Sequence, residues 1–236
     1  MKKNLKTNLC VSVIFWIVFT IYTVSVKFID VATIGNKLSP VGFSSLNKFF
    51  FDLIIRSNNG VSASAFENPT INFTSYNISE ILGYFAIIVA VFFVLFGFCQ
   101  LIKNKSFKKV NRNIYALGGF YVCVMAFYAL FEVIIINYRP FLDAESGELE
   151  ASYPSSHTLL TLCILTSAII VFNYIFNNVK KSVYYTVSVI LFVIMMATVI
   201  TRLMSGVHWF TDILGGVLLS TALLMSFKTV IEKINN

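Results

Sequence analysis

Both histidines of the chain stand next to residues that can work with them on an anion. His157 directly follows the run PSS at 154–156, and His208 lies four residues before Asp212. A histidine can act as a nucleophile or as a general acid near neutral pH. If a helix has begun by His208, the two side chains share one face, and Asp212 would hold the imidazole Nδ1–H and direct Nε2 outward. The pair then follows the nucleophile–orienter logic of a catalytic triad.

Arginine and serine side chains near these histidines can supply donors for phosphate oxygens. Arg139 and Arg202 can each grip a phosphate through bidentate, charge-assisted hydrogen bonds. Pro154 followed by Ser155 is typical of a helix start, where free backbone N–H groups point toward an anion. The hydroxyls of Ser155 and Ser156 add further donors. The sequence therefore predicts a phosphate-binding site, and with no thiol cluster and no H-E-x-x-H motif we expect neither a metal nor a cofactor.

The composition decides where such a site must be built. Apolar residues make up 57% of the 236 residues and charged residues 12%, whereas soluble domains carry about 45–50% and about 25%. This excludes a water-soluble domain and a disordered chain. A disulfide-stapled secreted domain is excluded too, because the four cysteines lie singly in apolar runs. An integral membrane protein remains, with room for roughly six helices.

Six apolar stretches predict an all-α, polytopic protein with six transmembrane helices in one domain, 1–236. They do not alternate apolar and polar residues as the strands of a membrane barrel would. The first follows MKKNLK without an A-x-A-like cleavage site, so we expect a retained helix. The predicted spans are about 9–26, 81–102, 114–136, 158–176, 183–200 and 213–227.

The segment between the first two spans predicts one further element. The stretch SLNKFFFDLII at 45–55 is apolar with a few charges and is short for a span. We expect an amphipathic helix in the membrane interface, anchored by Phe49, Phe50 and Phe51. The role of the whole segment 27–80 stays open at this stage.

Basic residues predict the orientation of the spans. The net charge is +7, from 18 Lys and Arg against 11 Asp and Glu. Lysines and arginines gather at the N-terminus, at 103–112, at 180–181 and at the C-terminus. The positive-inside rule places these four segments in the cytoplasm. The candidate site residues then lie on the extracytoplasmic face of a cell membrane.

Three motifs resemble those of the type 2 phosphatidic acid phosphatase superfamily of membrane lipid phosphatases, which is related in motif to the haloperoxidase and acid phosphatase group. The family's motifs are K-x6-R-P, P-S-G-H and S-R-x5-H-x3-D. This chain has E-x6-R-P from Glu132 to Pro140, P-S-S-H from Pro154 to His157, and T-R-x5-H-x3-D from Thr201 to Asp212. The spacing is the same in all three, and the motif core spans 132–212.

The resemblance implies a role for each matching residue. His208 would attack phosphorus and form a phosphohistidine, with Asp212 orienting it. His157 would protonate the leaving oxygen and later activate the water that releases phosphate. Arg139 and Arg202 would bind the phosphoryl oxygens, helped by Ser155 and Ser156. The resemblance implies no metal.

Three positions depart from the family's pattern. Ser156 replaces a glycine, Thr201 replaces a serine, and Glu132 replaces the lysine of the first motif. The last change is the serious one, because a carboxylate repels phosphate. We hypothesise that Glu132 orients an arginine and does not touch phosphate. Arg139 follows it by about two helical turns, so the two side chains can share a face.

The resemblance and the topology together lead to an expected function. We expect a bacterial membrane lipid phosphatase acting on a lipid phosphomonoester or pyrophosphate, with undecaprenyl pyrophosphate as the first candidate substrate and phosphatidylglycerophosphate or phosphatidate next. The expected partners are this lipid and the bilayer, without nucleic acid; the oligomeric state is not indicated. A lipid phosphotransferase and a catalytically impaired lipid-binding homologue stay open. A transporter is disfavoured, since the chain shows neither internal repeats nor Gly/Pro-broken spans.

Overall fold

Six long apolar helices run through the computed structural model, which describes residues 2–34, 39–59, 71–140, 150–176 and 178–236. Within these residues, six helices are long and apolar enough to cross a membrane, as predicted. The full helices extend several predicted spans by up to eight residues. They are α1 (Lys2–Phe28), α3 (Phe73–Asn104), α4 (Arg112–Val133), α5 (Ser156–Ile175), α6 (Lys181–Met204) and α7 (Phe210–Asn235).

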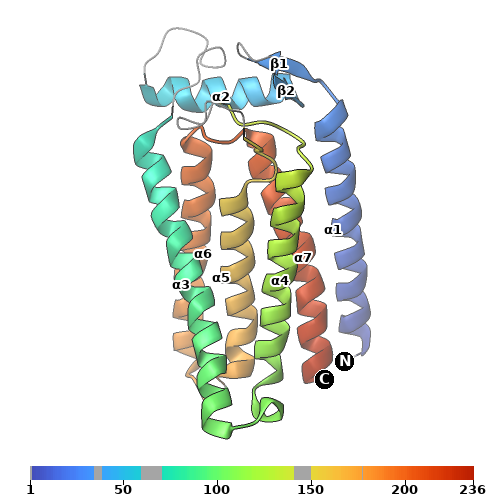
Figure 1. The fold of residues 1–236 in the computed structure, drawn as a ribbon, viewed down its shortest axis with the longest axis vertical. Helices are drawn as coiled ribbons and strands as arrows, with labels where there is room; N and C mark the ends of the chain where they lie inside the picture. Colours follow the sequence, from blue (N-terminus) through green and yellow to red (C-terminus); the bar gives the residue numbers. More distant parts are fainter. Residues whose placement is uncertain (1, 35–38, 60–70, 141–149, 177) are drawn as a thin grey trace.

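The helices α5 and α7 form the centre of the bundle. Half of the most apolar window of each is buried, against 11–22% in α1, α3, α4 and α6. Helix α5 packs against α3, α4, α6 and α7, and it stands in the middle of the bundle in Figure 1. The outer helices expose leucine, isoleucine, valine and phenylalanine side chains along their length. Such faces suit contact with lipid tails, because the tails are as apolar as these side chains and their exposure there costs no free energy.

The chain crosses one end of the bundle with a short hairpin and a lateral helix. Strands β1 (Ala32–Ile34) and β2 (Ser39–Val41) pair antiparallel, and α2 (Ser44–Asn59) follows them. Figure 1 shows α2 lying across the bundle, at the end opposite both termini. The predicted amphipathic helix is therefore present and lies over the bundle.

The anchoring of α2 differs from the prediction. Phe50 stacks on Phe210 with ring centroids 3.9 Å apart, and Phe51 is buried against Trp209 at 5.4 Å. Of the three phenylalanines, Phe49 is the exposed one. Two of the expected membrane anchors thus pack onto the protein, because the helix covers the start of α7 and buries apolar area there.

Buried amides fix α2 and the hairpin to the end of the bundle. The Asn47 side chain donates to Thr211 Oγ1 at 2.9 Å and accepts from the Thr211 N–H at 3.1 Å. The Gly42 N–H donates to the Asn137 side chain at 3.0 Å. Because buried amides need their hydrogen bonds, these contacts fix one position for α2 and the hairpin over the end of the bundle.

Helices α1 and α7 are joined by polar contacts along their length. Near the termini Asn8 donates to Glu232 at 2.6 Å, and Ser12 lies 2.8 Å from Ser226. At the other end the Tyr22 hydroxyl donates to the Thr211 carbonyl at 3.0 Å. Such interhelical hydrogen bonds hold helices together in lipid, where no hydrophobic drive acts between them.

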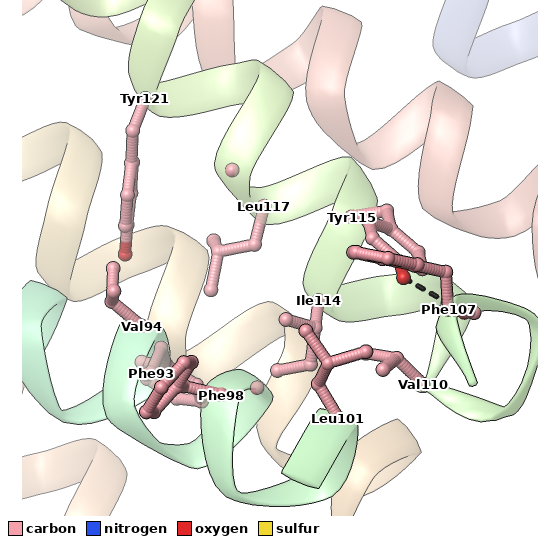
Figure 2. A pocket seen from close by; sticks show the side chains of 12 residues that line it. Phe93, Val94, Phe98, Leu101, Phe107, Val110, Ile114, Tyr115, Leu117 and Tyr121 are labelled. Atoms are coloured by element: carbon pink, nitrogen blue, oxygen red, sulfur yellow. Dashed lines mark hydrogen bonds between the residues drawn. The ribbon is translucent and has the colours of Figure 1, made fainter. Parts of the chain in front are cut away.

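An apolar cavity of about 320 Å³ lies at the end of the bundle that holds the termini. It is bounded by α3, by α4 and by the 3-10 turn η1 (Phe107–Lys109), with Phe93, Leu117 and Tyr121 among its walls (Figure 2). None of its lining residues belongs to the three sequence motifs. The cavity is therefore separate from the candidate site.

The close approach of the hairpin to α1 gives a stability prediction. A Cβ at Gly42 would lie 1.5 Å from the Val26 carbonyl oxygen, whereas a Cβ at Gly118 meets nothing within 4 Å. We expect Gly42→Ala to lower the Tm of detergent-solubilised protein by roughly 2–12 °C, since overpacking costs about 1–3 kcal/mol. Gly118→Ala is the matched control and should keep or raise the Tm, because alanine favours helix. An unchanged Tm in Gly42→Ala would contradict this packing.

Candidate active site

The motif residues converge beneath α2 at one end of the bundle. His157 lies in the first turn of α5, and Arg202 in the last turn of α6. His208 stands in the connection from α6 to α7, and Asp212 lies in the first turn of α7. Arg139 follows the end of α4. All five come from ends of elements that meet at this side of the bundle (Figure 1).

The Asp212 carboxylate is fully buried and is held by three donors. Its Oδ1 accepts from the Asn137 amide at 3.1 Å. Its Oδ2 accepts from the Trp209 N–H at 3.0 Å and from the Ser152 hydroxyl at 2.5 Å. A buried carboxylate is costly without such partners. The three donors therefore fix the carboxylate relative to three separate segments of the chain.

Ser152 links Asp212 to His208, which corrects the expected direct contact. His208 Nδ1 lies 3.9 Å from Asp212 Oδ2, too far for a hydrogen bond, and 3.1 Å from Ser152 Oγ. The i,i+4 argument fails because α7 begins at Phe210, so that His208 precedes the helix. Since Ser152 gives its one proton to Asp212, its oxygen accepts from His208 Nδ1–H. This tautomer leaves the lone pair on Nε2.

The surroundings of His208 favour its neutral form. The side chain is 2% exposed. Burial, and after it the positive charges of Arg202 and Arg139, hold the pKa of His208 well below its usual value. Desolvation and like charge both disfavour an imidazolium. The geometry and the charge together present a neutral Nε2, the form that a nucleophile requires.

A short antiparallel pairing positions Arg139 opposite Glu150. Tyr138 and Ala151 form an isolated β-bridge, and the Arg139 N–H donates to the Glu150 carbonyl at 3.0 Å. The Arg139 guanidinium also pairs with the Glu150 carboxylate at 3.0 Å. Because Glu150 is exposed, solvent weakens this ion pair.

Arg202 and His157 meet one acidic side chain that the sequence reasoning did not single out. Glu80 Oε1 lies 2.9 Å from Arg202 Nη1 and 3.1 Å from His157 Nε2. Arg202 is 2% exposed and also donates to the Ser79 hydroxyl at 3.2 Å. Helix α3 therefore contributes to the site, although none of the three motifs lies on it.

Unpaired polar atoms gather at this site. In the described part of the chain, four motif side chains each hold a buried nitrogen without a hydrogen-bond partner: Arg139 Nε, Arg202 Nε, His157 Nδ1 and His208 Nε2. Buried polar groups are normally paired, so each such atom calls for an explanation. Guanidinium donors beside two imidazoles suit an anion with several oxygens.

The two serines before His157 have different surroundings. Ser156 lines a small polar pocket together with Arg139 and His208. Ser155 is fully buried, its N–H donates to the Asp212 carbonyl at 3.0 Å, and its hydroxyl accepts from Thr158 at 3.2 Å. The Ser155 N–H thus joins α5 to α7 and is not free for an anion, while its buried hydroxyl accepts a hydrogen bond from within α5. Of the two serines, Ser156 is the one that lines the pocket.

Comparison with known proteins assigns the family. Residues 115–235, more than half of the chain, match the PAP2 superfamily. The chain belongs to this superfamily. Its fold is similar to the crystal structure of a transmembrane PAP2-type phosphatidylglycerolphosphate phosphatase from Bacillus subtilis, with a TM-score of 0.58, 16% identity, and coverage of 94% of this chain and 96% of that one. No curated protein matches the sequence.

Glu132 departs from the PAP2 pattern at a position that faces the same pocket. It lines that pocket with Arg139, Ser156 and His208, and it forms a side-chain hydrogen bond with Tyr128, one turn earlier on α4. The two motif arginines have Glu80 and Glu150 as their ion-pair partners among the described residues. The structure therefore gives no contact for the hypothesis that Glu132 orients an arginine.

Three PAP2 site residues were missed by sequence reasoning: Asn137, Ser152 and Glu80. Asn137 lies inside the first motif's gap, and Ser152 two residues before the second motif. Neither type nor spacing marks them, since serine and asparagine are common in loops. Glu80 did carry a signal, because a carboxylate next to an apolar span is costly and tends to be functional.

The lowered pKa of His208 predicts an acid-sensitive stability. Below about pH 6.5 the unfolded chain binds a proton at this histidine while the folded chain does not, so unfolding becomes easier as the pH falls. One proton corresponds to about 1.4 kcal/mol per pH unit. We expect the Tm to fall less between pH 7 and pH 5 in His208→Gln than in the wild type. Equal slopes would contradict a neutral, buried His208.

Proposed function

We propose that this PAP2 protein is a membrane lipid phosphatase that works through a phosphohistidine at His208. The observation that carries the proposal is the set of four unpaired nitrogens on Arg139, Arg202, His157 and His208. Two guanidinium donors can bind phosphoryl oxygens while a neutral imidazole Nε2 faces phosphorus. Catalysis of phosphoryl transfer consists mostly of such positioning and charge stabilisation.

In the first step His208 Nε2 attacks phosphorus, and the bond between phosphorus and the lipid oxygen breaks. His157 enters this step as an imidazolium and gives the Nδ1 proton to the leaving oxygen, because its Nε2 side is directed at Glu80. Asp212, acting through Ser152, stabilises the positive charge that develops on His208. The dephosphorylated lipid leaves.

In the second step water attacks the phosphohistidine. His157, now neutral, takes a proton from this water, the bond between Nε2 and phosphorus breaks, and inorganic phosphate forms. Arg139 and Arg202 neutralise the phosphoryl oxygens in both steps. The cycle ends with His208 neutral and His157 protonated, as it began. Every proton that His157 gives to the leaving oxygen is thus replaced by one taken from water.

The substrate that fits this site is a lipid phosphomonoester or pyrophosphate. The site lies at the end of a bundle of membrane-spanning helices, where a head group can enter while its tail stays in the bilayer. Both termini lie at the opposite end (Figure 1). With basic residues at that end in the cytoplasm, the site is extracytoplasmic. The leading candidates are undecaprenyl pyrophosphate and phosphatidylglycerophosphate, followed by phosphatidate. Phosphatidylglycerophosphate is the lipid after which the similar Bacillus subtilis phosphatase is named.

The proposal is tested by phosphate release from purified protein in detergent. We expect release from at least one of undecaprenyl pyrophosphate, phosphatidylglycerophosphate and phosphatidate, unchanged by EDTA. His208→Ala should lower the rate by about 10³-fold or more, since it removes the nucleophile. The exposed Ser182→Ala, at the far end of α6, is the matched control and should retain the wild-type rate.

Two results would contradict the proposal. The first is release by His208→Ala at the wild-type rate. The second is the absence of release from every lipid by well-folded wild type. Mass spectrometry of the lipid products identifies a phosphotransferase, because the phosphate would then appear on an acceptor lipid.

A further inference from the structure

One face of α3 reaches the candidate site and belongs to none of the family's three motifs. Tyr76, Ser79, Glu80 and Gly83 are spaced i, i+3, i+4 and i+7, which places them on one helical face. Each contacts a motif residue. The Arg202 guanidinium lies 5.4 Å from the centroid of the Tyr76 ring and 3.2 Å from the Ser79 hydroxyl. The contacts of Glu80 and Gly83 reach His157.

Glu80 joins the proposed general acid to a phosphate-binding arginine. One oxygen, Oε1, lies within hydrogen-bonding distance of both His157 Nε2 and Arg202 Nη1. An ionised carboxylate only accepts hydrogen bonds, so His157 Nε2 carries a proton and donates a hydrogen bond to Glu80. The proton exchanged with substrate must then be on Nδ1, the ring nitrogen without a partner.

Gly83 is an independent sign that α3 is shaped around His157. A Cβ at this position would lie 2.9 Å from His157 Cδ2 and 3.4 Å from Nε2. The imidazole therefore packs on the helix backbone, one turn beyond the carboxylate that it contacts. Glu80 and Gly83 together set both the position of the ring and the nitrogen that faces away from α3.

We propose that Glu80 is a positioning residue that fixes the proton-carrying nitrogen of His157 and ties it to Arg202. The inference rests on the proposed phosphatase function and adds to it a second histidine–carboxylate pair. Asp212 serves the nucleophile through Ser152, and Glu80 serves the general acid directly. The negative charge of Glu80 also offsets the positive charge of Arg202, and this favours the protonated form of His157.

The test compares Glu80→Gln with the wild type on two soluble phosphomonoesters. One is p-nitrophenyl phosphate, whose leaving group departs without protonation, and the other is a short-chain alkyl phosphate. The glutamine keeps the size and an acceptor but loses the charge. We expect kcat for the alkyl ester to fall by about tenfold or more and kcat for the aryl ester to fall much less, because general-acid catalysis matters for poor leaving groups. The alkaline limb of the alkyl-ester rate profile should move to lower pH.

A second variant and a control accompany this measurement. Gly83→Ala pushes the His157 ring from its place and should show the same selective loss, which keeps the inference testable if Glu80→Gln fails to fold. Glu232→Gln is the control, since this glutamate is also hydrogen-bonded and lies at the other end of the bundle. It should leave both rates unchanged.

The outcomes separate this inference from the proposed function. Equal loss on both esters with an unmoved pH profile would overturn the positioning role, as would a change confined to KM or no change at all. The proposed function fails separately, if the wild type releases no phosphate or if His208→Ala remains active.

Discussion

A carboxylate with no exposure to solvent, that of Asp212, is the constraint on which the site depends. Such a charge is tolerated only with several donors in good geometry. The donors come from the segment after α4, from the segment before α5 and from the N-terminus of α7, through Asn137, Ser152 and Trp209. Satisfying this one charge therefore brings three parts of the chain together. The start of α7 also favours a negative charge through its helix dipole.

The rest of the site follows from that position. Ser152 can accept from His208 because it has already donated to Asp212, which sets the tautomer of the histidine. The same pairing of 137–139 with 150–152 carries Arg139 toward the pocket. Helix α2 covers this end, and its Asn47 bonds Thr211, the residue before Asp212. Helix α2 and the Ser152 hydroxyl that contacts His208 are thus held by neighbouring residues at the start of α7, Thr211 and Asp212.

Much of the frame could be predicted from the sequence, because spanning a bilayer imposes one simple pattern. Apolar runs of sufficient length located all six spans, and the amphipathic pattern located α2. Polar helix ends were harder. Helix α3 begins at Phe73, where Asn72 caps it and donates its N–H to the Ser205 carbonyl, whereas the apolar run begins at Ile81. The polar stretch FTSYNISE carries no apolar pattern that indicates a span, so the sequence did not place Glu80 in the site.

Other parts of the site depended on tertiary contacts that no local pattern encodes. The spacing of His208 and Asp212 indicated a direct bond, yet the helix start at Phe210 separates them and Ser152 lies between. Ser155 has the residue type of a phosphate donor, yet its side chain is fully buried and its N–H donates to the Asp212 carbonyl of α7. Motif spacing thus located the site but not the hydrogen bonds within it.

The hydrogen bonds that link Asp212 through Ser152 to His208 are tested most directly by the rate at which the protein becomes phosphorylated. Rapid mixing with a radiolabelled lipid phosphate, followed by an alkaline quench that preserves phosphohistidine, measures this step, and mass spectrometry locates the phosphate. We expect label on His208 and phosphorylation about 10–100-fold slower in Ser152→Ala, since a charge-assisted hydrogen bond is worth about 1.5–3 kcal/mol. Label on another residue, or an unchanged rate in Ser152→Ala, would contradict this mechanism.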